Sequence, residues 1–249
     1  SKPYTTVYNG FLAYVPLEQT NKILALEHVK AVHRAPQHTP DLSASVPLIG
    51  APEVWNNLGY DGEGVTIAVI DTGIDYTHAA LGGSGDPDDY ANNDPDVVET
   101  GTFPTVKVMD GYDYAGTTYN ADDTDPAYQP VPHPDDDPLD ENGHGTHVAS
   151  TAAGIAAGQV MTGVAPAATL VALKVFGAEG STNLVVNALD DAVANYLEFG
   201  WPQVINMSLG SNYGPGDVDD PDVVATNLAV AAGIVVATSI GNSANVPYI

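Results

Sequence analysis

The chain has 249 residues, no cysteine, and 32 acidic residues against six Lys and Arg, which gives a formal net charge of −26. Nucleic acid phosphates would be repelled by this charge, so nucleic acid is excluded as a partner. A chain without cysteine has no disulfide, no thiolate zinc site and no cysteine nucleophile. Every apolar run is too short to span a bilayer, and we expect no membrane partner.

Half of the acidic residues lie in three segments rich in Asp, at residues 86–96, 122–140 and 217–222. Solvated loops explain such segments most simply. Two further interpretations stay open. One is structural Ca²⁺ binding, because Ca²⁺ prefers carboxylate and carbonyl oxygens, and the other is adaptation to high salt. None of the segments has the spacing of an EF-hand, so the sequence assigns no metal ligand, and we expect no cofactor for catalysis.

Residues 1–40 have the pattern of a small unit of their own. Residues 9–16 alternate like a strand, residues 17–26 carry apolar residues at helical spacing, and residues 29–33 predict a second strand. A βαβ-like piece of this size is too small to hold a good core alone. The Pro-, Ser- and His-rich stretch that follows predicts a linker or processing segment at residues 41–50.

From residue 51 to residue 249 the pattern predicts one α/β domain. Buried strands are expected at residues 65–70, 169–176, 204–209 and 234–238. Helices are expected at residues 51–58, 182–196 and 222–232, with Ser181 or Thr182 capping the second. Strands that alternate with helices indicate a parallel sheet with helices on both faces. Residues 82–142 show no such rhythm and predict a long irregular segment.

Polar residues follow the predicted strands where a parallel sheet gathers its working groups, beyond the carboxyl ends. Asp71 ends the first strand, Asn242 follows the last, and His144 opens a predicted helix of small residues. Asp71 would accept a hydrogen bond from one ring nitrogen of His144, while the other nitrogen takes a proton from a serine. The Asn242 amide would donate to the developing oxyanion. This chemistry is acyl transfer.

Five sequence blocks carry a resemblance to a known family. They are Val-Ile-Asp-Thr-Gly-Ile-Asp (69–75), Asn-Gly-His-Gly-Thr-His-Val-Ala-Ser (142–150), Gly-Val-Ala-Pro (163–166), Asn-Met-Ser-Leu-Gly (206–210) and Ala-Thr-Ser-Ile-Gly-Asn-Ser (237–243). In this order they resemble the subtilisin family of serine peptidases. Residues 107–114 and 133–140 also resemble the larger secreted bacterial subtilases of the minor extracellular protease type.

The resemblance implies a three-layer α/β fold and a secreted, extracellular endopeptidase that acts on polypeptides. It implies Asp71 and His144 as members of a catalytic triad, Asn242 as the oxyanion donor, and His147 as a structural histidine. Two backbone segments would pair with extended substrate by strand addition. Their residues are Gly177, Gly180 and Ser181 in one segment, and Ser208, Leu209 and Gly210 in the other.

The sequence departs from the family pattern in one respect. A Gly-Thr-Ser-Met-Ala-like nucleophile block does not occur in these 249 residues, so we expect a catalytic domain that is incomplete at its C-terminal side. Residues 1–40 resemble the second half of the family's inhibitory propeptide, which implies that the chain's own propeptide is an intramolecular inhibitor. A small α+β remnant is the fold expected for it.

Two alternative functions compete with a serine peptidase. The chain could be a non-catalytic fragment or pseudo-peptidase that binds peptides in the groove. Metal-dependent hydrolysis through His144 and His147 is disfavoured, because two His at i, i+3 without an intervening Glu do not match the His-Glu-x-x-His arrangement.

Overall fold

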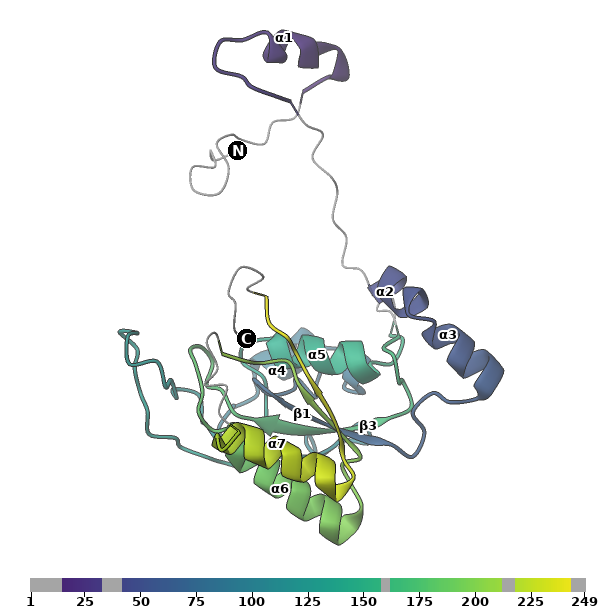
Figure 1. The fold of residues 1–249 in the computed structure, drawn as a ribbon, viewed down its shortest axis with the longest axis vertical. Helices are drawn as coiled ribbons and strands as arrows, with labels where there is room; N and C mark the ends of the chain where they lie inside the picture. Colours follow the sequence, from purple (N-terminus) through teal and green to yellow (C-terminus); the bar gives the residue numbers. More distant parts are fainter. Residues whose placement is uncertain (1–14, 33–41, 158–161, 212–217, 243–249) are drawn as a thin grey trace. The chain divides into compact units, whose positions relative to one another are not determined.

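The computed structural model describes residues 15–32, 42–157, 162–211 and 218–242 (Figure 1). The chain divides into two compact units, Ser1–Asp41 and Leu42–Ile249. In the first unit, the 3₁₀ turn η1 (Leu17–Gln19) and helix α1 (Thr20–Leu24) form within the predicted helix. The predicted strand at residues 29–33 is wrong over its described residues, 29–32, which have no regular structure. The described part of this unit contains no strand. The strand predicted at residues 9–16 lies outside that part except for residues 15 and 16.

The second unit opens with short helices. Helix α2 (Leu42–Leu48) was not predicted and lies within the proposed linker or processing segment, whose role stays a prediction. Helix α3 (Ala51–Glu53) continues as the π-helical turn η2 (Val54–Leu58), so the helix predicted at residues 51–58 is confirmed. The indole N–H of Trp55 donates to the Val164 carbonyl at 2.9 Å, which ties this segment to the body of the unit.

A five-stranded parallel sheet with the order β2-β3-β1-β4-β5 forms the centre of the unit. The strands are β1 (Thr66–Asp71), β2 (Val108–Asp113), β3 (Thr169–Lys174), β4 (Val204–Met207) and β5 (Val235–Thr238). The four predicted strands are confirmed to within two residues at each end. Strand β2 was missed, because its Val-Met-Asp-Gly-Tyr-Asp sequence mixes polar residues and glycine inside the long acidic segment.

Helices cover both faces of this sheet. Figure 1 shows α5 (His144–Ala153) on one face and α6 (Val185–Phe199) with α7 (Pro221–Ala232) on the other. Side chains alternate accordingly along β1: Ile67 and Val69 pack toward α5, whereas Ala68 and Ile70 pack toward α6 and α7. Besides β2, the long segment before α5 contains the short 3₁₀ turn η3 (Ala79–Leu81) and the short helix α4 (Pro87–Ala91). The predicted α/β architecture of three layers is confirmed.

Helix α6 begins at Val185, three residues later than predicted, and the predicted cap is wrong. Its N-cap is Leu184, which makes no side-chain capping bond. The Thr182 hydroxyl instead donates to the Val175 carbonyl and accepts from the Leu184 N–H, so it anchors the turn after β3. Helix α7 is capped by Asp220, whose carboxylate accepts from the N–H groups of Asp222 and Val223.

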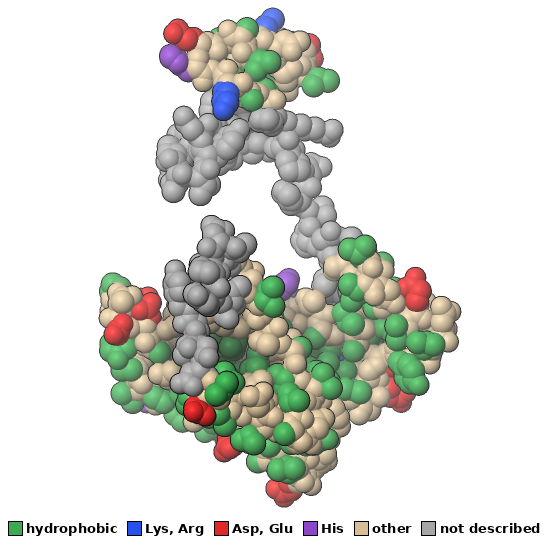
Figure 2. Space-filling view, viewed as in Figure 1, with side chains coloured by type: hydrophobic (Ala, Val, Ile, Leu, Met, Phe, Trp, Pro, Cys, Tyr) green, Lys and Arg blue, Asp and Glu red, His purple; other side chains and the backbone are tan. Residues whose placement is uncertain are grey.

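Basic residues are almost absent from the surface of the second unit. Residues 42–249 contain 29 of the 32 acidic residues but only Lys107 and Lys174 as basic ones, and both lysines are buried. On the face in Figure 2, Lys and Arg side chains accordingly appear only in the first unit. Lys107 is held by the carbonyls of Pro166 and Ala168, and burial lowers its pKa to about 8. Within the described ranges, no helix is both long and apolar enough to cross a membrane.

Helix α5 packs closely on β1 because its inward face is made of small residues. Gly145, Ala149 and Ala153 are all buried at four-residue spacing. A Cβ atom built on Gly145 would lie 2.1 Å from the carbonyl oxygen of Gly73, just beyond β1. The absence of a side chain at Gly145 therefore allows the start of the helix to contact the backbone just beyond the strand.

We expect Gly145→Ala to lower the free energy of unfolding of the full chain by roughly 1–3 kcal/mol, because the added methyl group forces the helix away from the strand. Gly210→Ala is the matched control. A Cβ there meets nothing within 4 Å, so a change below about 0.5 kcal/mol is expected. Urea unfolding curves measure both values, and equal midpoints for the two variants would contradict the close contact.

Candidate active site

Asp71 and His144 are in direct contact at the carboxyl edge of the sheet. Asp71 is the last residue of β1, and His144 is the first residue of α5. The His144 Nδ1 atom lies 2.7 Å from Asp71 Oδ1. The Asp71 side chain is only 1% exposed, whereas the imidazole is 51% exposed. A buried carboxylate thus holds a ring whose other edge is open to a substrate.

The environment of Asp71 defines the proton arrangement on His144. An ionised carboxylate only accepts hydrogen bonds, so the contact requires the proton on Nδ1 and leaves the lone pair of neutral imidazole on Nε2. Burial raises the pKa of Asp71, and the hydrogen bonds from His144 and from the Thr72 N–H oppose this rise. The arrangement can serve a general base that is oriented and stabilised by its carboxylate.

Asp140 fixes the junction between β1 and α5. It is 2% exposed. Its Oδ1 accepts from the Thr72 hydroxyl at 2.8 Å and from the Gly143 N–H at 2.9 Å, and its Oδ2 accepts from the N–H and hydroxyl of Thr146 at 2.8 and 2.6 Å. The Thr72 hydroxyl in turn accepts from the Gly145 N–H at 2.8 Å. One carboxylate therefore caps the helix and binds it to the strand that carries Asp71.

The segment at residues 177–181 follows β3 and is braced from two sides. The Ala178 N–H donates to the Thr117 carbonyl at 2.9 Å, and the Ala178 carbonyl accepts from the Asn142 side chain at 3.0 Å. Of the predicted substrate-binding residues, Gly177 is buried, Ser181 is half-buried and Gly180 is exposed. Asn142 thereby connects this segment directly to the loop that leads into His144.

The second predicted binding segment and the predicted oxyanion donor follow the neighbouring strands. Ser208, Leu209 and Gly210 come directly after β4, and the Leu209 carbonyl accepts from the Ser239 hydroxyl at 3.0 Å. Asn242 lies beyond β5 with an exposed side chain. Parallel topology brings both segments to the edge that carries Asp71 and His144. The roles of all these residues stay predictions.

His147 lies one turn after His144 and is exposed. In the described part of the chain, no group of three or more His, Cys, Asp and Glu side chains is arranged to hold a metal ion. Many carboxylates of the acidic loops accept from backbone N–H groups two residues ahead, as Asp86, Asp122 and Asp135 do. Turn formation thus accounts for much of the Asp content, and calcium binding stays a prediction.

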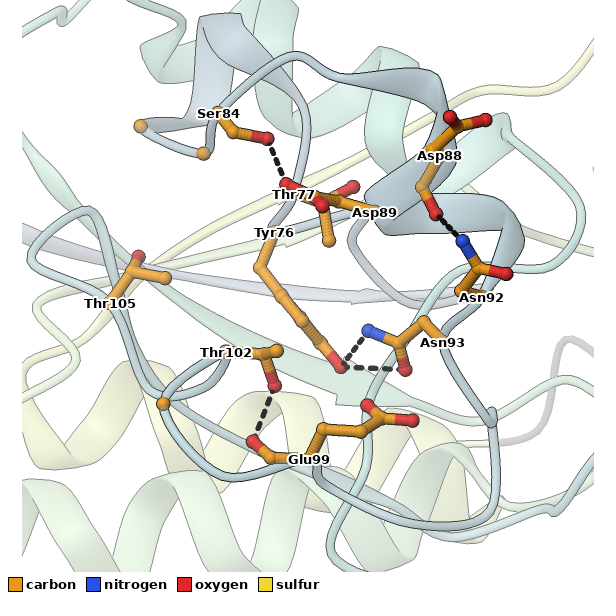
Figure 3. A pocket seen from close by; sticks show the side chains of 13 residues that line it. Tyr76, Thr77, Ser84, Asp88, Asp89, Asn92, Asn93, Glu99, Thr102 and Thr105 are labelled. Atoms are coloured by element: carbon orange, nitrogen blue, oxygen red, sulfur yellow. Dashed lines mark hydrogen bonds between the residues drawn. The ribbon is translucent and has the colours of Figure 1, made fainter.

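A polar cavity of about 470 Å³ lies apart from this pair, among residues 76–105 (Figure 3). In Figure 3 the side chain of Asn93 points to the Tyr76 hydroxyl, to which it donates at 3.1 Å. The same hydroxyl donates to the fully buried Asp137 at 2.9 Å. Neither Asp71 nor His144 lines the cavity, so it is not the candidate active site.

Sequence reasoning missed the residues that support the pair. The position of Asp140 in the sequence could have predicted its role, since a carboxylate four residues before the first helical residue can reach the free N–H groups of the first turn. The roles of Lys174 and Thr72 could not be predicted from the sequence, because their partners lie far away along the chain.

The fold and site define an α/β protein with an acid–base pair at the carboxyl edge of its sheet. Residues 62–248 match the Subtilase family. The chain is 32% identical over 98% of its length to the minor extracellular protease Vpr of Bacillus subtilis (strain 168). It is 34% identical over 96% to the PII-type proteinase of Lacticaseibacillus paracasei, and 29% identical over 91% to subtilisin E of Bacillus subtilis (strain 168). The chain belongs to the subtilase family, as its sequence blocks predicted.

The chain spans only part of these relatives. It covers 28% of the length of the Vpr protease, 12% of the PII-type proteinase and 46% of subtilisin E. These matches therefore show the family of the chain but not the activity of a full-length protein.

We expect Asp140→Asn to destabilise the full chain by about 1–3 kcal/mol, because the amide cannot accept on both of its heavy atoms and leaves buried donors without partners. Asp123→Asn removes the same charge from an exposed loop position and should change stability by less than about 0.5 kcal/mol. Thermal unfolding of both variants measures the difference. Equal melting temperatures would show that the junction does not depend on Asp140.

The raised pKa of the buried Asp137 carboxyl predicts that the stability of the chain depends on pH. Burial raises its pKa to about 6, above an unfolded value of about 3.9. Between these values the folded chain binds more protons, so the free energy of unfolding falls as pH rises. Asp137→Asn should reduce the fall between pH 4 and pH 7 by roughly 2–3 kcal/mol. Urea unfolding at both pH values measures it, and an unchanged fall would contradict the raised pKa.

Proposed function

We propose that this chain is part of a secreted serine endopeptidase that hydrolyses peptide bonds in polypeptides. The observation that carries the proposal is the hydrogen bond between Nδ1 of His144 and the buried Asp71. It leaves Nε2 as the base that takes the proton of a serine nucleophile and later returns it to the leaving amine. Membership of the subtilase family supports the same chemistry.

The substrate would lie extended between two backbone segments. Residues 177–181 would form one edge and residues 208–210 the other, so that main-chain hydrogen bonds give affinity and the pockets between them give specificity. Asn242 would donate its side-chain amide to the oxyanion of the tetrahedral intermediate. The brace between Asn142 and Ala178 supports this arrangement, because it links the first edge to the base.

The nucleophile would come from a part of the protein that follows Ile249. The chain covers less than half of subtilisin E, which leaves room for a Gly-Thr-Ser block in a longer protein. Large side chains on β5 and α7 are exposed, among them Val235 at 63% and Leu228 at 60%, and further chain packed there would bury them.

Residues 1–40 would act as part of an intramolecular inhibitor, with residues 41–50 as the processing segment. Secretion is supported by one relative that is named an extracellular protease. Residues 1–41 carry four of the six basic residues, whereas the remainder is strongly acidic.

In the full-length parent protein, His144→Ala should lower kcat/KM for a peptide substrate by about 10⁶-fold, because the serine loses the base that takes its proton. His147→Ala removes an exposed imidazole one turn away and should keep activity close to that of the wild type. A continuous assay with a chromogenic peptide measures both variants. Retained hydrolysis by the His144 variant would sink the proposed mechanism.

A non-catalytic, peptide-binding role for residues 1–249 is the second candidate. It is favoured by the exposed imidazole at the same edge of the sheet as the two predicted binding segments and by the missing nucleophile block. A serine-reactive fluorophosphonate added to the 249-residue chain distinguishes the two. Peptide binding without labelling supports the fragment role, and labelling or turnover rules it out.

For calcium, we expect that EDTA lowers the melting temperature of the full chain and that added Ca²⁺ restores it, because ligand binding to the folded state alone stabilises that state. Mg²⁺ at equal ionic strength is the control for simple screening of the acidic loops. A melting temperature that does not respond to EDTA would dismiss a structural calcium ion.

A further inference from the structure

Lys174 is a buried charge that the proposed reaction does not use. It is the last residue of β3 and is fully buried. Its Nζ lies 2.8 Å from Asp113 Oδ2 and 3.1 Å from Glu141 Oε2. The strand register places Lys174 between Asp113 on β2 and Asp71 on β1, so all three residues end neighbouring strands at the same level.

Two carboxylates keep this ammonium charged inside the unit. Burial acts to lower the pKa of Lys174, but attraction to Asp113 and Glu141 outweighs it and raises the pKa. Asp113 is itself fixed, since its Oδ1 accepts from the N–H groups of Ala115 and Gly116 at 2.7 and 2.8 Å. Lys174 is therefore a buried cation that contacts Asp113 and also donates to Glu141.

The ion pair between Glu141 and Lys174 fixes the loop that leads into His144. It lies three residues before the imidazole, and its Oε2 also accepts from the Thr117 hydroxyl at 2.9 Å. Its neighbours hold the same loop in other directions: Asp140 binds the first turn of α5, and Asn142 binds Ala178. Of these three consecutive residues, Glu141 is the one that forms an ion pair with the buried Lys174.

We propose that Glu141, held by Lys174, is a positioning residue that sets the imidazole of His144 against Asp71. An anchored carboxylate at this point limits the movement of the loop and hence of the first helical residue. Its effect on catalysis rests on the proposed peptidase function. Its effect on the hydrogen bond between His144 and Asp71 does not, and can be observed in the chain of 249 residues.

The proton on His144 Nδ1 reports the geometry directly, because a hydrogen bond to a buried carboxylate moves its NMR signal downfield and slows its exchange with water. In the full chain labelled with ¹⁵N, Glu141→Gln should broaden this signal and move it upfield, with the fold retained. Thr117→Val removes one of the two donors to Glu141 and should act in the same direction, but less. Asp123→Asn, an equal loss of charge in an exposed loop, should leave the signal unchanged.

Glu141→Asp separates position from charge. It keeps the carboxylate but shortens the side chain by one methylene, so the bridge to Lys174 no longer spans, and the signal should again be perturbed. A wild-type signal in Glu141→Asp together with a perturbed signal in Glu141→Gln would assign the effect to charge and overturn the proposal. An unchanged signal in both Glu141→Gln and Thr117→Val would overturn it as well.

Kinetics of the full-length parent give a second readout. Glu141→Gln should lower kcat roughly 10- to 100-fold through misplacement of the base. KM should change little, because the Thr117 carbonyl keeps its bond to the Ala178 N–H. A raised KM with unchanged kcat would contradict the positioning role. If the wild-type parent hydrolyses no peptide, the peptidase proposal fails, and the NMR result alone decides the proposal for Glu141.

Discussion

The contact between the end of β1 and the start of α5 is the constraint on which the candidate site depends. Asp71 and His144 are 73 residues apart in the chain, yet their side chains are 2.7 Å apart. Gly145 allows the helix to approach the Gly73 backbone, and Asp140 joins the helix to the end of the strand with hydrogen bonds. Without this junction, neither residue alone would form an oriented base.

The second unit buries four aspartates with its two lysines, whereas its other described carboxylates are partly or fully exposed. Its two lysines are both buried, and Lys174 neutralises carboxylates beneath the site. The remaining acidic residues lie mainly in loops, where several cap turns of their own backbone. Solvation and local hydrogen bonding are sufficient to keep such carboxylates charged. The excess negative charge therefore affects long-range attraction more than the stability of the fold.

Patterns local in sequence predicted most of the fold. Strands β1 and β3 are nearly continuous apolar runs, and the helices beside them carry apolar residues at helical spacing, so burial on both faces could be read directly. Strand β2 could not, because its buried positions depend on pairing with β3 rather than on an apolar run. The cap predicted for α6 was wrong for a similar reason, since the Thr182 hydroxyl donates to the carbonyl of Val175.

The candidate site shows the same division. Asp71 and His144 could be named from their blocks, and parallel topology indicated that both lie at one edge of the sheet. The supporting side chains could not be named, because Asp140, Glu141 and Lys174 act through partners that only the folded chain brings together. Sequence therefore identifies the candidate reacting groups, whereas the structure identifies the side chains that hold them.

The central claim is that His144 and Asp71 are the base and its carboxylate in a serine peptidase whose nucleophile lies outside residues 1–249. A crystal structure of the full-length parent after reaction with a peptidyl phosphonate tests it most directly. The account predicts a covalent adduct on a serine beyond Ile249, with its oxygen within hydrogen-bond distance of His144 Nε2. An adduct on a serine within residues 1–249, or one distant from His144, would contradict it.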